Sequence, residues 1–195
     1  MLKIFLIAIL LIPLPGYSKP FKIGMGFAQG LFSQSENNIS SSALLSPGVQ
    51  FTLKISEKFV FGTGTNIYLD FSTGSVFLNS LQINSLYYFK GKPFKEYIEN
   101  EGDQITTLSK WAFASGIELK NYKYFLGNDI PVTSNLKSEG SFYNLNLLAQ
   151  ADYRLNSNWE LSANTSFSLL SFGSSENGVK LNSILLTFGL NYLVD

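Results

Sequence analysis

The sequence predicts an all-β fold, a transmembrane eight-stranded antiparallel up-and-down β-barrel. Two observations predict it. Eight segments alternate between apolar and small or polar residues with a period of two, which is the period of a β-strand. Charged residues make up 14% of the 195 residues, against about 25% in ordinary soluble domains, while aromatic residues reach 15%. A surface so poor in charge suits lipid better than water.

The N-terminus has the pattern of a signal peptide covering 1–18, which leaves 19–195 as the barrel. Lys3 precedes an apolar run over 4–12, and the small residues Gly16 and Ser18 stand at the two positions that a signal peptidase inspects. The run is too short for a membrane-spanning helix, which needs about 20 residues. We therefore expect export through the Sec pathway, with cleavage after Ser18.

The eight alternating segments follow one another along the rest of the chain. They cover 21–28, 48–55, 59–71, 80–90, 111–120, 143–155, 159–170 and 184–194. In all eight, one face carries no charge, and every charged strand residue lies on the other face. The uncharged face is bulky and aromatic, whereas the other is rich in Gly, Ala, Ser and Asn. Because an eight-stranded barrel has a narrow lumen that side chains just fill, the bulky face is predicted to point outward into lipid. A soluble barrel with its apolar face inside is the alternative.

Aromatic residues at alternate strand ends predict an interfacial girdle at one rim. If the N-terminus is periplasmic, odd strands begin and even strands end at that rim. The predicted girdle consists of Phe21, Phe59, Tyr87, Phe89, Trp111, Phe113, Tyr153, Trp159 and Tyr192. The opposite rim would contain Phe71, Tyr143 and Phe167.

The connections fit a barrel with short turns on one side and longer loops on the other. Residues 56–58 and 156–158 are expected to be periplasmic turns, and 33–44, 126–140 and 173–178 external loops. The segment 91–110 is long for a periplasmic turn. Two interpretations stay open for it: a short helix that starts at Pro93, with Phe94, Tyr97 and Ile98 on one face, or a disordered polar turn.

The chain resembles the small outer-membrane β-barrel proteins of the OmpA/OmpX type over 19–195. The resemblance rests on this architecture. The last strand alternates as theirs do, through Leu186, Phe188, Leu190 and Tyr192, but the chain ends in Asp195 instead of an aromatic residue. The resemblance implies a monomer in the bacterial outer membrane, with outer-membrane lipid and the barrel assembly machinery as partners.

Five charged residues are predicted to point into the lumen. They are Glu118, Lys120, Asp152, Arg154 and Glu160. Buried charges need partners, so we expect Arg154 and Lys120 to pair with these carboxylates. The resemblance implies a salt-bridge network that plugs the lumen, with a substrate-binding or ion-conducting cluster as the alternative. Tyr88 belongs to the same bulky wall, and Tyr122 extends it if the alternation continues.

Catalytic, metal and cofactor sites are not expected. The chain has no Cys and no His, which removes thiol nucleophiles, the commonest general base and the commonest transition-metal ligand. The barrel enzymes of outer membranes rely on a catalytic His, so the resemblance implies a non-enzymatic protein. The formal net charge of zero gives no indication of nucleic acid as a partner.

Two functions remain open. The first is a structural, surface-contact or adhesion role, carried by Ser- and Asn-rich external loops. The alternative is transport of a small solute or an apolar molecule through the barrel, in the manner of a porin or an OmpW-like protein. Glycines that would leave one wall of the lumen poorly filled motivate it, namely Gly24, Gly26, Gly62, Gly64 and Gly189.

Overall fold

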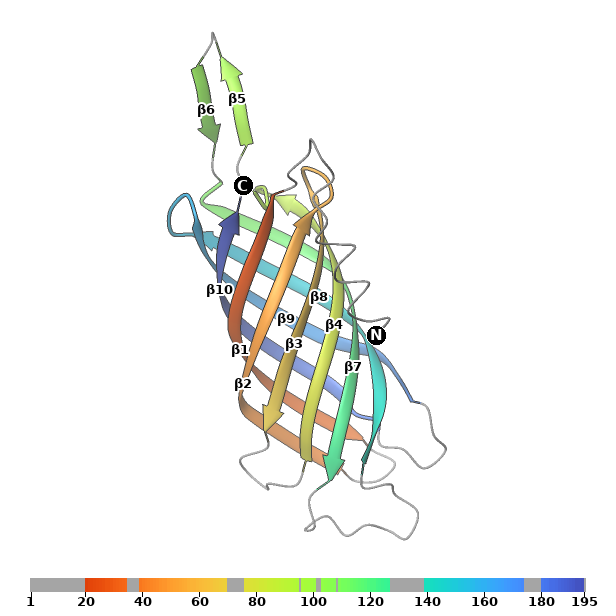
Figure 1. Cartoon of the computed structure of the whole chain (residues 1–195). Coiled ribbons are helices and arrows are strands. Elements are labelled where there is room, and N and C mark those ends of the chain that lie inside the picture. Colours follow the sequence, from red (N-terminus) through yellow and green to blue (C-terminus); the bar gives the residue numbers. More distant parts are fainter. Residues whose placement is uncertain are drawn as a thin grey trace, which may run out of the picture.

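The computed structural model describes residues 20–34, 39–69, 76–94, 96–100, 103–107, 109–126, 139–173 and 180–194. Eight strands in these ranges form a closed barrel, and two more form a separate hairpin (Figure 1). The barrel strands are β1 (Phe21–Gln34), β2 (Ile39–Lys54), β3 (Phe59–Leu69), β4 (Val76–Lys90), β7 (Trp111–Leu126), β8 (Glu139–Arg154), β9 (Trp159–Gly173) and β10 (Asn182–Val194). The hairpin strands are β5 (Glu96–Asn100) and β6 (Asp103–Thr107). The predicted fold class is confirmed. The predicted signal peptide lies outside the described residues.

Every barrel strand is antiparallel to both of its neighbours, and β1 pairs with β10 to close the sheet. Closure leaves the barrel without a free strand edge, so each backbone ladder is paired on both sides. In the closing pair Phe21 stands opposite Val194. The first and last strands therefore begin and end at the same end of the barrel, which we call the terminal end (Figure 1). The opposite end is the loop end. Within the described residues, no helix is long and apolar enough to span a membrane.

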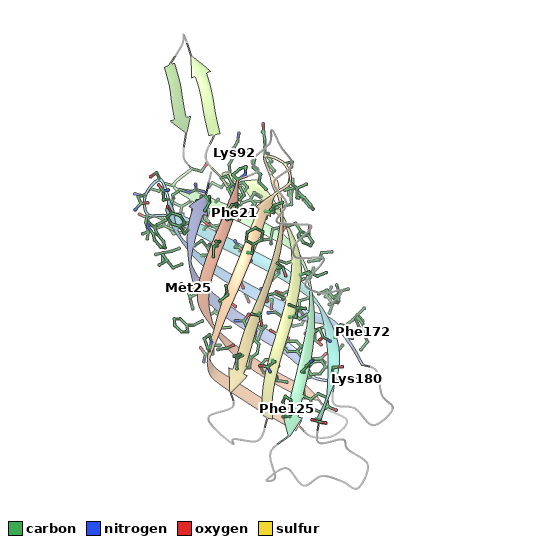
Figure 2. The ribbon with its side chains drawn as sticks, in the orientation of Figure 1. Phe21, Met25, Lys92, Phe125, Phe172 and Lys180 are labelled. Atoms are coloured by element: carbon green, nitrogen blue, oxygen red, sulfur yellow. The ribbon has the colours of Figure 1, made fainter. Side chains whose placement is uncertain are left out.

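Side chains alternate between the outside and the lumen along the strands. On β1, Met25 is 69% exposed, whereas Lys22 is 3% exposed. All eight barrel strands expose large apolar side chains on the outside, and Figure 2 shows Met25 and Phe172 projecting away from the ribbon. The apolar face therefore lies outside, as the alternation predicts.

The strands extend beyond the predicted segments at the loop end. The prediction of an external loop over 33–44 is wrong for most of these residues, because β1 extends to Gln34 and β2 starts at Ile39. In the same way β4 starts at Val76 and β7 runs to Leu126. Backbone pairing does not require apolar side chains, so strands can continue where their outward residues no longer need to be apolar. At the loop end the strands therefore continue beyond the residues in which apolar and polar side chains alternate.

A bulge in β9 reverses the predicted faces near the loop end. Leu145 of β8 stands opposite Leu170, but the next residue of β8, Asn146, stands opposite Ser168. One extra residue of β9 is thereby inserted, and an inserted residue shifts the alternation by one position. Leu170 is consequently exposed on the outside, where the sequence placed it in the lumen.

The segment 91–110 forms neither the expected helix nor a disordered turn. Its described part contains the hairpin β5–β6, in which Ile98 stands opposite Ile105, and Figure 1 shows this hairpin projecting from the terminal end. Gly91 has a φ of 71°, and a Cβ there would collide with the Trp111 carbonyl. Phe94 is buried. Because Phe94 is buried in the barrel, it does not form a helix face with Tyr97. The backbone N–H and C=O groups that follow it form hydrogen bonds between β5 and β6 instead of within a helix.

Candidate functional site

A buried ion cluster fills the lumen near the terminal end. Lys22 Nζ lies 2.6 Å from Glu160 Oε1 and 3.7 Å from Asp152 Oδ2. Arg154 Nη2 lies 3.1 Å from Glu160 Oε2. All four side chains are buried. We call these residues the terminal cluster; its two cations and two carboxylates balance in formal charge.

Strand register brings the terminal cluster together. Arg154 ends β8 and stands directly opposite Glu160 of β9, while Lys22 enters from the start of β1. The sequence placed Lys22 on the inner face of the first strand but not in the charge network. Lys22 and Glu160 are 138 positions apart, so only closure of the barrel makes them neighbours. The signal that could have found Lys22 is that it is the only charged residue in the first alternating segment.

Neutral donors complete the hydrogen bonding of both carboxylates. The Tyr88 hydroxyl donates to Asp152 at 2.6 Å, and Gln150 Nε2 donates to both Asp152 oxygens, at 2.9 and 3.1 Å. Asn191 Nδ2 donates to Glu160 Oε1 at 3.2 Å. Carboxylates held by cations and neutral donors on several sides are the arrangement expected of a structural network.

The short segment after β4 folds against the terminal cluster. Arg154 Nη2 donates to the carbonyl oxygens of Pro93 and Lys92, at 3.1 and 3.4 Å. Lys22 Nζ lies 5.3 Å from the centre of the Phe94 ring, within cation–π range. Phe94 packs in a buried apolar cluster with Val60, Leu86, Tyr88, Ala112, Ala114, Leu148 and Leu193. The ion cluster and this apolar cluster together fill the terminal end of the lumen.

Glu118 and Lys120 form a separate ion pair. They are consecutive inward positions on β7, with Lys120 Nζ 3.4 Å from Glu118 Oε2. Asn146 Nδ2 donates to the same carboxylate at 2.8 Å, and Lys120 Nζ lies 3.4 Å from the Tyr68 hydroxyl. Among the described residues, no ion pair joins Glu118 or Lys120 to the terminal cluster. The five charged residues singled out in the sequence therefore belong to two groups.

An aromatic plug fills the lumen toward the loop end. Its members are Phe32, Tyr68, Tyr122, Tyr124 and Phe142, all buried. The ring centres of Tyr122 and Phe142 are 5.0 Å apart, and those of Phe32 and Tyr68 are 5.3 Å apart. The rings come from β1, β3, β7 and β8, so they pack across the lumen. The sequence named Tyr122 as part of the bulky wall and placed Tyr68 on the inner face of the segment 59–71. Continuing the alternation past the predicted strand ends would have found Phe32, Tyr124 and Phe142.

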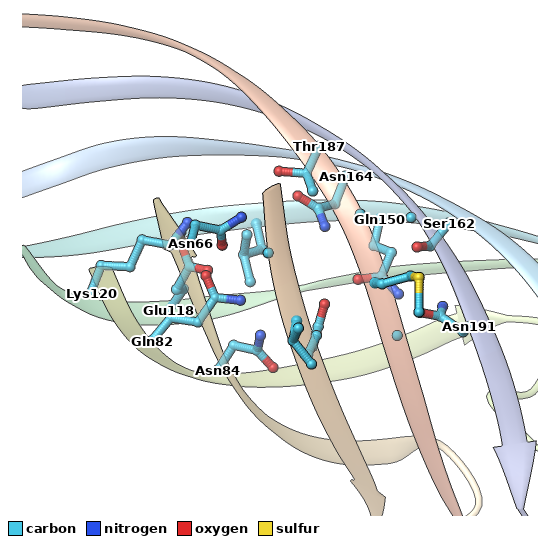
Figure 3. Close-up of a pocket in the computed structure, with 18 residues that line it drawn as sticks. Asn66, Gln82, Asn84, Glu118, Lys120, Gln150, Ser162, Asn164, Thr187 and Asn191 are labelled. Carbon is cyan, nitrogen blue, oxygen red and sulfur yellow. Dashed lines mark ion pairs between the residues drawn. The ribbon is translucent and has the colours of Figure 1, made fainter. Parts of the chain in front are cut away.

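A small polar cavity lies between the two fillings (Figure 3). Its volume is about 30 Å³, which is room for about two water molecules. Gln82 and Asn84 line it, and each has a side-chain oxygen without a hydrogen-bond partner among the described residues. The glycine-rich wall borders this cavity through Gly24, Gly26 and Gly189, as the sequence interpretation expected, but polar side chains fill much of the space beside the glycines. A Cβ on Gly24 would collide with the amide of Asn191, and one on Gly62 with the amide of Asn84.

The residues of the predicted girdle lie at the terminal ends of their strands. Six are exposed, namely Phe59, Tyr87, Phe89, Trp111, Trp159 and Tyr192. Phe21, Phe113 and Tyr153 are half-buried. Trp111 packs on Tyr153 with 4.6 Å between ring centres, and Trp159 on Tyr192 with 5.0 Å. At the loop end Tyr143 stacks on Phe172, at 5.6 Å. Phe167 is exposed on the outside, and Phe71 lies outside the described residues.

The closed antiparallel sheet, its apolar outer face and its filled lumen define the class: this is a small eight-stranded β-barrel protein of the outer membrane. No known family model and no curated protein matches the chain. Among solved structures, Neisserial surface protein A (NspA) is similar, with 18% identity and a TM-score of 0.64 over 90% of this chain and 99% of its own. That likeness shows a shared fold.

Two further solved barrels align with lower scores. The attachment invasion locus protein Ail of Yersinia pestis has 9% identity and a TM-score of 0.49, over 91% of this chain and 100% of its own. OprG of Pseudomonas aeruginosa has 14% identity and a TM-score of 0.49, over 91% and 96%.

Proposed function

We propose that this protein is a non-enzymatic outer-membrane barrel with a non-conducting lumen, which serves as a structural or surface-contact element through its loop end. The observation that carries the proposal is the filling of the lumen at two levels. The aromatic plug packs across it on one side of the polar cavity, and the terminal cluster with Phe94 packs across it on the other.

Transport through the barrel has less support. A solute path needs continuous space, and the polar cavity holds about 30 Å³ between the two fillings. To pass, a solute would have to displace the stacked rings of Tyr122 and Phe142 at one level and break the buried Arg154–Glu160 pair at the other. Breaking such a pair is costly because a charge is left without its partner in the interior.

The setting of the lumen carboxylates among the described residues supports a non-enzymatic role. Asp152 and Glu160 share Lys22 as a partner, and both are buried and held by hydrogen-bond donors. A general acid or base must reach its substrate within hydrogen-bond distance, which this packing prevents. The sequence offers no His or Cys to replace them.

The orientation of the barrel supports surface contact through the loop end. Short turns are periplasmic in such barrels, and residues 55–58 and 155–158 join their strands at the terminal end. The loop end would then face the exterior. By its printed name, the structurally similar NspA is a surface protein.

Planar bilayer recording tests the closed lumen. We expect the purified protein to show no discrete conductance steps, because the two fillings leave no continuous path. A variant altered at both levels, with Tyr122→Ala and Phe142→Ala in the aromatic plug and Phe94→Ala, Arg154→Ala and Glu160→Ala at the terminal end, serves as the opened comparison and should show transient steps. Folding of both proteins is checked by a shift in gel mobility between unheated and boiled samples. Discrete open levels of the unaltered, folded protein would refute the non-conducting lumen and favour transport.

Epitope labelling tests the orientation. An epitope inserted between Ile130 and Pro131, in the connection from β7 to β8, should be labelled by antibody on intact cells. The same epitope inserted after Ser157, in the turn between β8 and β9, should be labelled only after the outer membrane is permeabilised. The reverse pattern would remove the basis for surface contact through the loop end.

A further inference from the structure

An apolar groove of about 380 Å³ lies on the outer face of the barrel near the terminal end. Its size is within the range of about 300–1,000 Å³ that is typical of sites for small molecules. Ala151, Ser162, Ala163 and Gly189 are its small residues, and the larger Trp111, Tyr153, Leu161 and Phe188 also line it.

The strand register explains why the groove exists. Along one row of paired residues, Ala151 of β8 stands opposite Ala163 of β9, with Phe113 and Phe188 on the outer strands of the same row. Two adjacent methyl groups between two phenyl rings leave a depression. The next row toward the loop end, Ser115–Ala149–Thr165, is also small. The depression formed by small side chains therefore continues from the girdle toward the membrane midplane. A lipid acyl chain extends in the same direction.

Two lysines, called here the rim lysines, lie next to aromatic residues that line or flank this groove, since Tyr153 lines it and Phe113 pairs with Ala151. Lys110 Nζ lies 5.6 Å from the centre of the Tyr153 ring, and Lys90 Nζ lies 5.7 Å from the centre of the Phe113 ring. Both side chains are exposed, and neither forms an ion pair with a carboxylate of the described residues. Lysines beside interfacial aromatic rings lie at the level of lipid headgroups, where each attracts anionic lipid.

We propose that this groove binds one anionic phospholipid of the adjoining leaflet. An acyl chain would lie along Ala151 and Ala163, and the phosphate would lie within reach of Lys110 and Lys90. The charge at the rim favours this occupant over a second copy of the chain. A two-fold interface centred on the groove would gather the lysines of both copies at one contact, and among the described residues no carboxylate lines the groove to oppose them.

The two tryptophans of the chain provide the assay. Trp111 lines the groove, whereas Trp159 belongs to the girdle on β9 and does not line it. Trp159→Phe leaves Trp111 as the only indole, and Trp111→Phe leaves Trp159. Each single-tryptophan protein is reconstituted in phosphatidylcholine bilayers with increasing fractions of phosphatidylglycerol that carries brominated acyl chains. Fluorescence quenching then reports the relative affinity for the anionic lipid next to each indole.

We expect Trp111 to report about 30-fold preference for the anionic lipid, because each of the two lysines near the headgroups contributes about 1 kcal/mol, which is about fivefold. Trp159 should report a preference near one. Replacing both rim lysines, Lys90→Gln with Lys110→Gln, should bring the Trp111 value to near one. Lys58→Gln, on the turn between β2 and β3 at the same end, is the charge-matched control and should leave it unchanged.

Filling the groove provides a second test that does not depend on charge. Ala163→Leu should reduce quenching of Trp111 by the brominated lipid, whereas Val49→Phe, which adds bulk to the exposed outer face of β2, should not. Equal preferences at the two tryptophans, or a Trp111 preference that survives loss of both lysines, would overturn the proposal. The proposal would also be overturned if the protein sedimented with twice the monomer mass and the brominated lipid did not quench Trp111. That result would indicate a second copy of the chain in the groove.

Discussion

Replacing Leu147 with arginine is expected to lower the free energy of unfolding in lipid by about 2–4 kcal/mol. Leu147 is on the outside of β8 near the middle of the strand, and its row partners are Ile117 and Phe167. All three side chains are apolar and exposed, so the position corresponds to the lipid midplane. A guanidinium there must lose its hydration or draw water into the bilayer.

Urea-induced unfolding in lipid vesicles measures this cost, with Gln150→Arg as the matched control on the same strand. Gln150 faces the lumen and donates to both oxygens of Asp152, a role that a guanidinium can also fill. We expect the control to lose much less stability. Asn146 would be a poor control because it is buried and bonded to Glu118. Equal losses for the two variants would show that the two faces of β8 do not differ in environment.

The variant Arg154→Met is expected to lose about 3–5 kcal/mol of stability, the cost of breaking a buried ion pair by removing one partner. It takes the cation from Glu160 Oε2 and the donor from the Pro93 carbonyl. Two buried carboxylates are then left with Lys22 as the only cation of the terminal cluster. Unfolding in lipid vesicles measures the loss.

A double-mutant cycle separates the pairing from the packing. Adding Glu160→Gln to Arg154→Met restores equal numbers of cations and carboxylates, since Lys22 and Asp152 remain 3.7 Å apart. The double variant should therefore be less destabilised than the sum of the two single variants. Simple additivity would indicate that Arg154 acts on its own and that the terminal cluster is not a coupled network.

The inner and outer faces were predictable wherever strands cross the apolar layer. Lys120 and Tyr122 follow each other on the inner face of β7, and the alternation placed both there. The same rule failed at Leu170, because a bulge adds one residue to β9 and nothing in the local pattern marks the insertion. It failed likewise at Lys90, which the alternation placed in the lumen but which is exposed beside Phe113, because the register of β4 shifts between Tyr88 and Lys90. It also failed over 33–44, where the strands continue without an apolar face.

The segment after β4 shows another limit of sequence reasoning. The spacing of Phe94, Tyr97 and Ile98 fits a helix face, but the interior of the barrel competes for Phe94. Because Phe94 is buried beside Lys22, it is not available to form a helix face with Tyr97 and Ile98, which lie in the β5–β6 hairpin. A local pattern cannot report such competition, because the competing site is built from strands far away in the sequence.

The sequence by itself determined which side chains face lipid and which face the lumen wherever a strand runs without a bulge, because alternation with a period of two is a property of each strand alone. Only the tertiary structure decided how those side chains meet. Closure of the barrel sets the relative register of the strands, and that register places Lys22 on Glu160, aligns Ala151 with Ala163, and packs Tyr122 against Phe142. The physical reason is that hydrophobic periodicity is local, whereas strand register, bulges and lumen packing depend on contacts between residues far apart in the chain.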